Sequence, residues 1–238
     1  MRNLAKLSMS EIRQSITVVG IDVGGERKGF HAVAIKDGGY CDQWPTKGTP
    51  NNSVEELVTW CRDRVKAQVV AIDAPCKWSI VGKFSRLAER DLMGCGIGCF
   101  STPSQDVAME RLRQSKHDGV SNHYGWMLCG EALYSALTNN YSLCEDLATV
   151  RLPFCFETYP HAVTRNALGE LAVARKKRNQ RMGLLDWDSE DLAKLRSMDM
   201  IDAALCAYTA YHAVTGGECV TYGDKETGLI IVPNGRLS

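Results

Sequence analysis

The chain has 238 residues, of which 45% are hydrophobic and 24% charged, and its formal net charge at pH 7 is zero. This length and composition predict an ordinary soluble globular protein with one large domain or two small ones. No apolar stretch approaches the roughly 20 residues of a membrane span, which excludes a transmembrane protein, and the neutral charge argues against tight binding along an extended nucleic acid.

The N-terminal segment, residues 1–15, alternates polar and apolar residues and has no apolar core of a secretory signal. We expect it to be a frayed tail or a short helix. Without such a signal, the ten cysteines are expected to be reduced and the protein to be cytoplasmic. Cys95 and Cys99 form the closest cysteine pair, but they lack the second ligand pair of a zinc site.

The first third of the chain predicts three strands joined by short glycine-rich turns, as in an antiparallel meander. These strands cover residues 16–23, 29–36 and 39–44. A helix follows from about Ser53 to Lys66, with Ser53 as its N-cap and Glu56 completing a capping box. The next strand, residues 69–73, completes a β-β-β-α-β order.

The remainder of the chain is mainly helical, with two more strands. A helical region spans about 80–150 and includes a helix at 131–137. The later predicted elements are a strand at 154–157, a helix from near His161, a helix at about 198–214 and a strand at 228–232. We expect one domain over residues 1–238, with the region 80–150 as a helical insertion.

This order of elements is that of the ribonuclease H-like fold, which belongs to the α/β class. We predict a central mixed sheet with strand order 3-2-1-4-5 and flanking helices, in which strand 2 runs antiparallel. The first and fourth strands then lie side by side at the centre of the sheet.

Three of the strands deliver carboxylates at or near their C-terminal ends, at Asp22, Asp73 and Glu157. Burying an anionic group costs several kcal/mol unless it is paired or binds a cation. If the first and fourth strands are neighbours, Asp22 and Asp73 stand side by side. Convergent carboxylates are typical of a divalent-metal site, so we predict bound Mg²⁺ or Mn²⁺.

The helix at about 198–214 adds Asp199 and Asp202, whose spacing places both on one helical face. Ala203 and Ala204 are small enough to let this helix approach a sheet closely. Asp199 lies nearer the helix start, where an acid also has a capping use. We therefore predict Asp202 as the fourth catalytic carboxylate and metal ligand, with Asp199 as an additional acid of the metal site.

Each acid also has a structural interpretation. Asp22 could cap the turn that follows it, and Asp73 also stands before a turn. Glu157 could pair with an arginine, and Asp199 or Asp202 could stabilise a helix N-terminus. We favour the functional interpretation because convergence of strand-end acids is the pattern of functional sites.

Further residues are candidates for binding substrate phosphate: Gly24, Gly25, Arg86, Arg90, Lys177 and Arg181. The glycines would let phosphate approach the backbone. Arg86 and Arg90 lie one helical turn apart and could instead pair with Glu89 and Asp91 on a solvated face. The basic run that contains Lys177 and Arg181 is more typical of a solvated face, and it would form a phosphate-binding patch only if it lies beside the acids.

Aromatic and histidine side chains have two interpretations each. His161 could shuttle a proton, or it could simply begin a helix. Trp78, Trp126 and Trp187 could stack on bases, although scattered aromatic residues are more often packing.

Several blocks of sequence together resemble a known family. They are Asp22–Gly25, Ala71–Pro75, Phe156–Pro160 and Asp199–Ala204, with Arg86–Arg90, Phe100–Pro103 and the basic segment Lys176 to Arg181 as further blocks. Over about 18–232 the chain resembles an uncharacterised family catalogued as domain of unknown function 429, described as a predicted nuclease of the ribonuclease H-like superfamily. The resemblance implies that fold and a metal-dependent nuclease site.

These observations predict a divalent-metal-dependent nuclease or phosphoesterase, which hydrolyses a phosphodiester in a nucleic acid or a small phosphoester. One alternative is a nucleotide-binding phosphotransferase of the sugar-kinase and actin-like type, in which an Asp-x-Gly-Gly turn admits phosphate. That type needs two such domains, and only one such turn is present. A second alternative is a non-catalytic binding domain that has kept the fold.

Overall fold

In the computed structural model, which describes residues 15–46, 52–118 and 122–235, eight strands form one mixed sheet in the order β3-β2-β1-β4-β6-β8-β7, with β5 paired to β6. The strands are β1 (Thr17–Val23), β2 (Phe30–Lys36), β3 (Gly39–Trp44), β4 (Val69–Asp73), β5 (Ser142–Leu143), β6 (Phe154–Glu157), β7 (Cys219–Asp224) and β8 (Gly228–Pro233). β1, β4, β6 and β8 run parallel, whereas β2 pairs antiparallel with both β1 and β3, and β7 with β8.

The predicted order of five strands is confirmed as β3-β2-β1-β4-β6, and the fold is ribonuclease H-like. β5 and β7 are absent from the prediction. β5 is only two residues long, and β7 lies at the sheet edge with mostly half-buried side chains, so it lacks the apolar run that marks an interior strand. The expectation for residues 1–14 lies outside the described residues.

The helices predicted at about residues 53–66, 131–137, from 161 and at 198–214 are present, and two helices at 177–182 and 189–194 are additional to the prediction. The helices are α1 (Val54–Thr59), continued by a π-helical turn η1 (Trp60–Arg64), α2 (Leu87–Gly94), α3 (Gln105–Asp118), α4 (Gly125–Leu137), α5 (Pro160–Leu168), the 3₁₀ turns η2 (Gly169–Leu171) and η3 (Ala174–Lys176), α6 (Lys177–Met182), α7 (Ser189–Lys194) and α8 (Met198–Val214). Ser53 caps α1 as predicted, because its Oγ accepts from the Glu56 N–H at 3.3 Å. Ser197 caps α8 in the same way through Met200. In the described part of the chain, no helix is long and apolar enough to cross a membrane.

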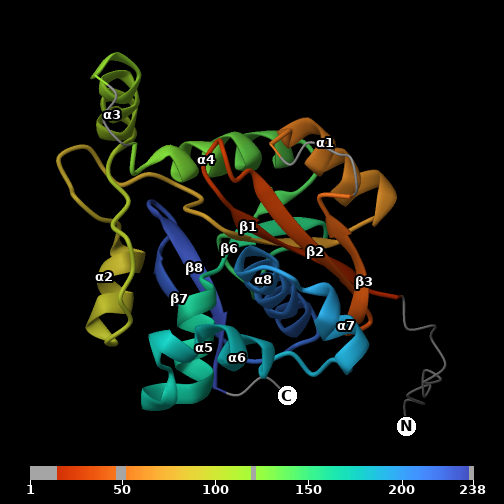
Figure 1. Cartoon of the computed structure of the whole chain (residues 1–238). Helices are drawn as coiled ribbons and strands as arrows, with labels where there is room; N and C mark the ends of the chain where they lie inside the picture. Colours follow the sequence, from red (N-terminus) through yellow and green to blue (C-terminus); the bar gives the residue numbers. More distant parts are fainter. Residues whose placement is uncertain (1–14, 47–51, 119–121, 236–238) are drawn as a thin grey trace, which may run out of the picture.

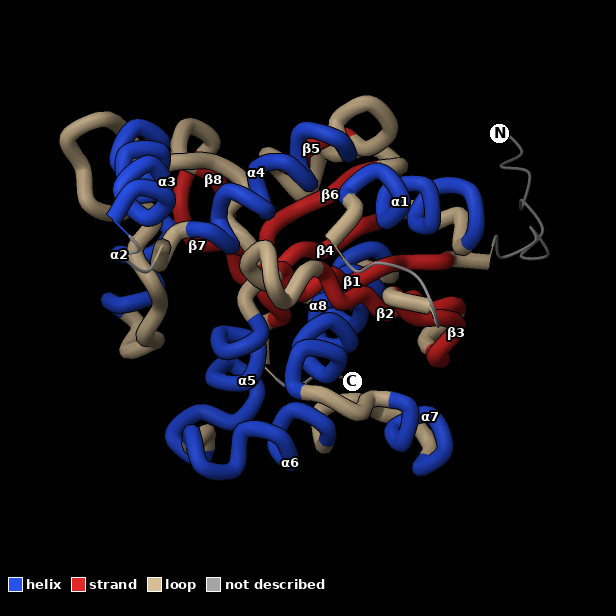
Figure 2. Tube along the Cα trace, turned by 45° about the horizontal axis from the view of Figure 1, so that its top comes forward, coloured by secondary structure: helices blue, strands red, loops and turns tan. Residues whose placement is uncertain are grey.

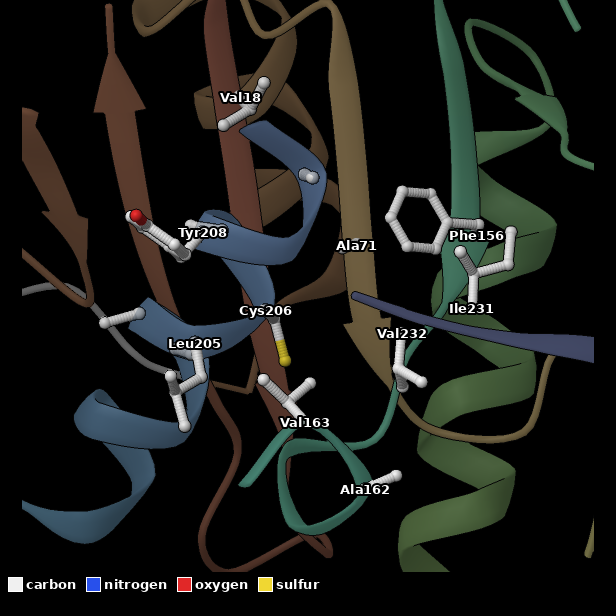
Figure 3. Close-up of a cluster of buried hydrophobic side chains, with 14 of the residues drawn as sticks. Val18, Ala71, Phe156, Ala162, Val163, Leu205, Cys206, Tyr208, Ile231 and Val232 are labelled. Atoms are coloured by element: carbon white, nitrogen blue, oxygen red, sulfur yellow. The ribbon is translucent and has the colours of Figure 1, made fainter. Parts of the chain in front are cut away.

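Helices cover both faces of the sheet (Figures 1 and 2). One face packs on α1 and α4, through side chains that include Ile21, Ile72 and Leu133. The opposite face packs on α8 and α5, and Figure 3 shows Val18, Ala71 and other strand residues of this face around Cys206 of α8. Because side chains alternate along a strand, neighbouring residues of β1 and β4 belong to opposite cores.

The contact between α8 and β1 is unusually close because Gly20 has no side chain. A Cβ atom at this position would overlap the backbone of Ala203 and Ala207, which lie one helical turn apart on α8. Gly20 and Asp22 are two residues apart on β1 and therefore face the same side. The start of α8 is thereby held against the carboxyl ends of β1 and β4, as the small residues of α8 predict.

Gly20→Ala should therefore destabilise the protein by on the order of 3 kcal/mol or more, because backbone atoms cannot rotate away from the added methyl group. Urea unfolding of the two proteins measures this difference. Gly94→Ala is the matched control, since a Cβ at Gly94 would meet no atom within 4 Å. A loss below about 1 kcal/mol for Gly20→Ala would show that α8 is not held in this way.

Candidate functional site

Two aspartates stand side by side at the ends of the central parallel strands. Asp22 of β1 is the register partner of Asp73, which ends β4, and both face α8. Burial, followed by the negative charges of Asp202 and Asp199, raises the pKa of Asp22 to about 7. Burial, followed by the charges of Asp22 and Asp202, raises the pKa of Asp73 well above its ordinary value. The nearby cations thus compensate this concentration of negative charge only in part.

The two acids of α8 lie at the same place, and each is engaged by basic side chains. Asp202 is buried, forms an ion pair with Arg181, and has Lys177 Nζ at 3.4 Å from its Oδ2. Asp199 is more exposed and accepts a hydrogen bond of 2.8 Å from Lys28 Nζ. The structure therefore brings Asp22, Asp73, Asp199 and Asp202 together, with basic residues between them.

Glu157 is directed away from this group, although it lines a cavity of about 40 Å³ together with Asp73 and its charge is among the smaller causes that raise the pKa of Asp73. Its register partner on β4 is Ile72, so its side chain faces α1 and α4, opposite to Asp73. There it binds the Arg86 guanidinium with both oxygens, at 2.7 and 2.8 Å, and accepts from the Cys76 N–H at 2.9 Å. The alternative in which Glu157 pairs with an arginine is the arrangement observed.

Arg86 is buried, with 1% of its surface exposed. Its Nε also donates to Glu89 Oε1 at 2.8 Å, and Glu89 in turn accepts from the Thr102 N–H at 3.0 Å. Arg86 and Glu89 do pair, but in the interior instead of on a solvated face. Arg90 is exposed on α2 and is not among the residues that line the cavity described below. The geometry thus favours a structural role for Arg86.

The two glycines after β1 differ in their surroundings. The Gly24 N–H donates to the Gly29 carbonyl at 2.9 Å, and a Cβ at Gly24 would lie only 2.8 Å from that oxygen. Gly24 is therefore required by the closure of its own turn. A Cβ at Gly25 would meet only the backbone nitrogen of Trp126, at 3.9 Å. Open space for a ligand lies beside Gly25 and not Gly24.

A cavity of about 350 Å³ opens beside the acids. It is lined by residues from the ends of β4 and α8, from α6 and α4, and from the loop after α2. Among them are Asp73, Asp202, Lys177, Arg181, Phe100 and Trp126. His161 is the second residue of α5 and also lines the cavity. Its position is therefore compatible with both interpretations, a proton shuttle and a residue that begins a helix. Its pKa is lowered by burial and by Arg181, which favours the neutral ring.

Thr158 and His31 are site residues absent from the sequence prediction. Thr158 follows Glu157, so it shares the face of Asp73, and both line a small adjoining cavity of about 40 Å³. The Thr158 hydroxyl is buried and has no hydrogen-bond partner among the described residues. Alternation from Phe154 through Phe156 would have identified it. His31, the register partner of Asp22, is half-buried, and burial lowers its pKa.

The donor chemistry of Asp22 and Asp73 suits a hard divalent cation, because carboxylate oxygens are its preferred ligands. Their raised pKa values show that the pair lacks full charge compensation. Within the described residues, no three His, Cys, Asp or Glu side chains are arranged to hold one metal ion. The physical reason is visible in the geometry, because Asp202 is turned toward Arg181 and Asp199 toward Lys28.

Comparisons with known proteins found one family and two solved structures that are similar to this chain. A family model described as "Protein of unknown function (DUF429)" matches residues 20–227. Two structures of RuvC from Thermus thermophilus are similar: one has 15% identity and a TM-score of 0.42, covering 84% of this chain and 97% of that one. The other, RuvC in complex with a Holliday junction substrate, has 14% identity and a TM-score of 0.41, covering 84% and 96%. The sequence has no significant match among curated proteins.

Proposed function

This chain belongs to the DUF429 family of proteins of unknown function, and we propose that it is a divalent-metal-dependent hydrolase that cleaves a phosphodiester. The carboxylates of Asp22, Asp73 and Asp202 would hold Mg²⁺ or Mn²⁺. Such an ion, when bound, lowers the pKa of water and stabilises negative charge on phosphoryl oxygens. The substrate would be a nucleic acid or a small phosphoester.

The observation that carries this proposal is the Asp22–Asp73 pair. Two carboxylates on adjacent strands, both with raised pKa values, repel each other and are partly withdrawn from water. A fold does not gain stability from this arrangement. A bound cation would attract both carboxylates and so offset the repulsion between them. Binding a cation is the usual role of such a pair at a strand end.

The basic residues supply the other half of the site. Lys177 and Arg181 line the same cavity as Asp73 and contact Asp202. These side chains would also bind substrate phosphate and neutralise its charge. The proposed ligand set excludes Glu157, because that side chain points to the other face and binds Arg86.

The two alternative functions receive less support. In a kinase-like site the glycine turn would cradle phosphate, whereas Gly24 is enclosed by its own turn and packed against Lys28 and Gly29. A non-catalytic binding domain needs no cation between Asp22 and Asp73, so a measured Mn²⁺ affinity separates it from the proposed enzyme.

Calorimetric Mn²⁺ titration of two variants tests the ligand set. We expect Asp202→Asn to weaken Mn²⁺ binding by about tenfold or more, because Asp202 faces both Asp22 and Asp73. Asp199→Asn should cause a smaller loss, because Asp199 is the more exposed acid and binds Lys28. A larger loss for Asp199→Asn would reverse the assignment. Wild-type protein that binds no Mn²⁺ would refute the proposed function.

A further inference from the structure

We propose that the cavity beside Asp73 binds one unpaired nucleotide, with its base stacked on Phe100 and Trp126 and its phosphate bound by Arg181 and Lys177. The inference deepens the proposed function, because it names the part of a substrate that the site accepts. The nucleotide can come from two sources, a free nucleotide or an unpaired position in a strand.

The aromatic side of the cavity is the first argument. Phe100 has 79% of its surface exposed, yet it lines the same two cavities as Asp73 and Trp126. Tyr159 also lines both. An aromatic ring exposed to water beside a cavity gains free energy when it stacks on the flat face of a base.

The loop that carries Phe100 is anchored on both sides. Tyr159 Oη donates to the Gly98 carbonyl at 3.0 Å, and the Thr102 N–H donates to buried Glu89 at 3.0 Å. The Phe100 ring is therefore exposed on a loop whose backbone is hydrogen-bonded to its surroundings on both sides of the ring. An anchored backbone reduces the conformational entropy that the loop loses when a ligand stacks on the ring.

The cationic side of the cavity is the second argument. Arg181 is only 3% exposed, and its guanidinium is held by Asp202. Its Nε atom is buried and has no hydrogen-bond partner among the described residues. Lys177 lies beside it with a side chain that is 46% exposed. An anionic phosphate would bind the exposed Lys177 ammonium, while buried Arg181 beside it adds positive charge.

The size of the cavity limits the ligand. Ligand pockets commonly measure about 300–1,000 Å³, and this cavity, at about 350 Å³, lies at the lower end of that range. A ligand of the size of one nucleotide suits this range. The cavity is lined by residues of α4, α5 and α6. The zero net charge also argues against binding along a duplex.

Metal-free fluorescence titration tests this inference, using EDTA and the base analogue 2-aminopurine. The probes are 2-aminopurine nucleoside monophosphate, a single-stranded octamer with one 2-aminopurine, and the duplex of that octamer. We expect the single strand or the monophosphate to bind about tenfold or more tightly than the duplex. A tighter single strand identifies the strand as the source, and equal affinities identify the free nucleotide. A duplex that binds as tightly as both other probes would overturn the inference.

Two matched variants locate the stacking position. Phe100→Ala should weaken binding of the preferred probe by about tenfold, whereas Phe84→Ala should not change it. Phe84 is 91% exposed in the loop before α2 and does not line the cavity. Both rings lie at the surface, so both variants are expected to fold. Equal affinities for the two variants would overturn the inference.

A third variant separates this inference from the proposed function. Asp73→Asn should retain metal-free binding of the probe, because it removes a negative charge near the phosphate, while it loses metal-dependent cleavage. If wild-type protein cleaves phosphodiesters but Phe100→Ala binds normally, the nucleotide site is refuted and the hydrolase stands. If the probe binds through Phe100 but no cleavage occurs, the hydrolase is refuted and the nucleotide site stands.

Discussion

Asp22→Asn should lower the metal-dependent phosphodiesterase rate by about 10²–10³-fold, while the metal-free protein becomes more stable at pH 8. Asn keeps the size of the side chain but removes the charge that would attract the cation. Without metal, the same charge destabilises the folded protein, because it is buried beside Asp73, Asp199 and Asp202. Loss of activity together with a gain in stability is the signature of a functional residue and not of a structural one.

The pH dependence of the gain follows from the direction of the pKa shift. The pKa of Asp22 is about 7 in the folded protein, against an ordinary value of 3.8. Between these pH values the folded state holds a proton that the unfolded chain has released. Stability therefore falls as pH rises through this interval, and the full cost is present above about pH 7. The advantage of Asp22→Asn should be absent near pH 4 and complete at pH 8.

Urea unfolding in EDTA at pH 4 and pH 8 measures the stability, and Mn²⁺-dependent cleavage of single-stranded, duplex and small phosphoester substrates measures the activity. Asp63→Asn is the control, since Asp63 is exposed and a hydrogen bond from Arg62 lowers its pKa. It should show no gain at pH 8. Undiminished cleavage by Asp22→Asn would remove this carboxylate from the mechanism.

Glu157→Gln should produce the opposite result, a stability loss of about 3–5 kcal/mol with unchanged Mn²⁺ affinity in the folded fraction. The Arg86 guanidinium would keep Glu89 but lose a bidentate carboxylate in a buried position. A buried charge without full compensation is among the costliest defects in a protein. The metal site should be unaffected, because Glu157 points to the other face of the sheet.

Glu145→Gln provides the comparison, because Glu145 pairs with Lys77 at 3.0 Å near the surface, with 52% of its own side chain exposed. Removal of this pair should change the unfolding free energy by about 1 kcal/mol or less. Urea unfolding of both variants and calorimetry with Mn²⁺ provide the readouts. A drop in Mn²⁺ affinity for Glu157→Gln that equals the drop for Asp202→Asn would return Glu157 to the ligand set.

Local sequence pattern was sufficient for the centre of this fold. The apolar runs before Asp22 and Asp73, separated by two strands and one helix, predict adjacent parallel strands, and the register confirms this arrangement. The small residues beside Asp202 predict close approach of α8, and Gly20 explains how it occurs. In each case the signal lies within a few residues of the feature.

The surroundings of Glu157 could not be predicted in the same way. The face of the sheet to which Glu157 points depends on how side chains alternate along β6, where a shift of one residue reverses the face. A strand of only four residues specifies this alternation weakly. Its partner Arg86 lies 71 positions away in the chain, so only the tertiary structure shows the pair. The ion pairs of Asp202 with Arg181 and of Asp199 with Lys28 are likewise contacts between distant segments.

The contact of Gly20 with α8 has a consequence for the choice between ions of different radius. Asp22 and Asp202 belong to two backbones that are already in contact through Gly20 and Ala203. These backbones cannot move closer, and outward movement of α8 would open a void in the core around Cys206. If these carboxylates bind a metal ion as proposed, adjustment from Mg²⁺ to the larger Ca²⁺ would therefore have to come from side-chain rotation, since the contact at Gly20 limits movement of the two backbones.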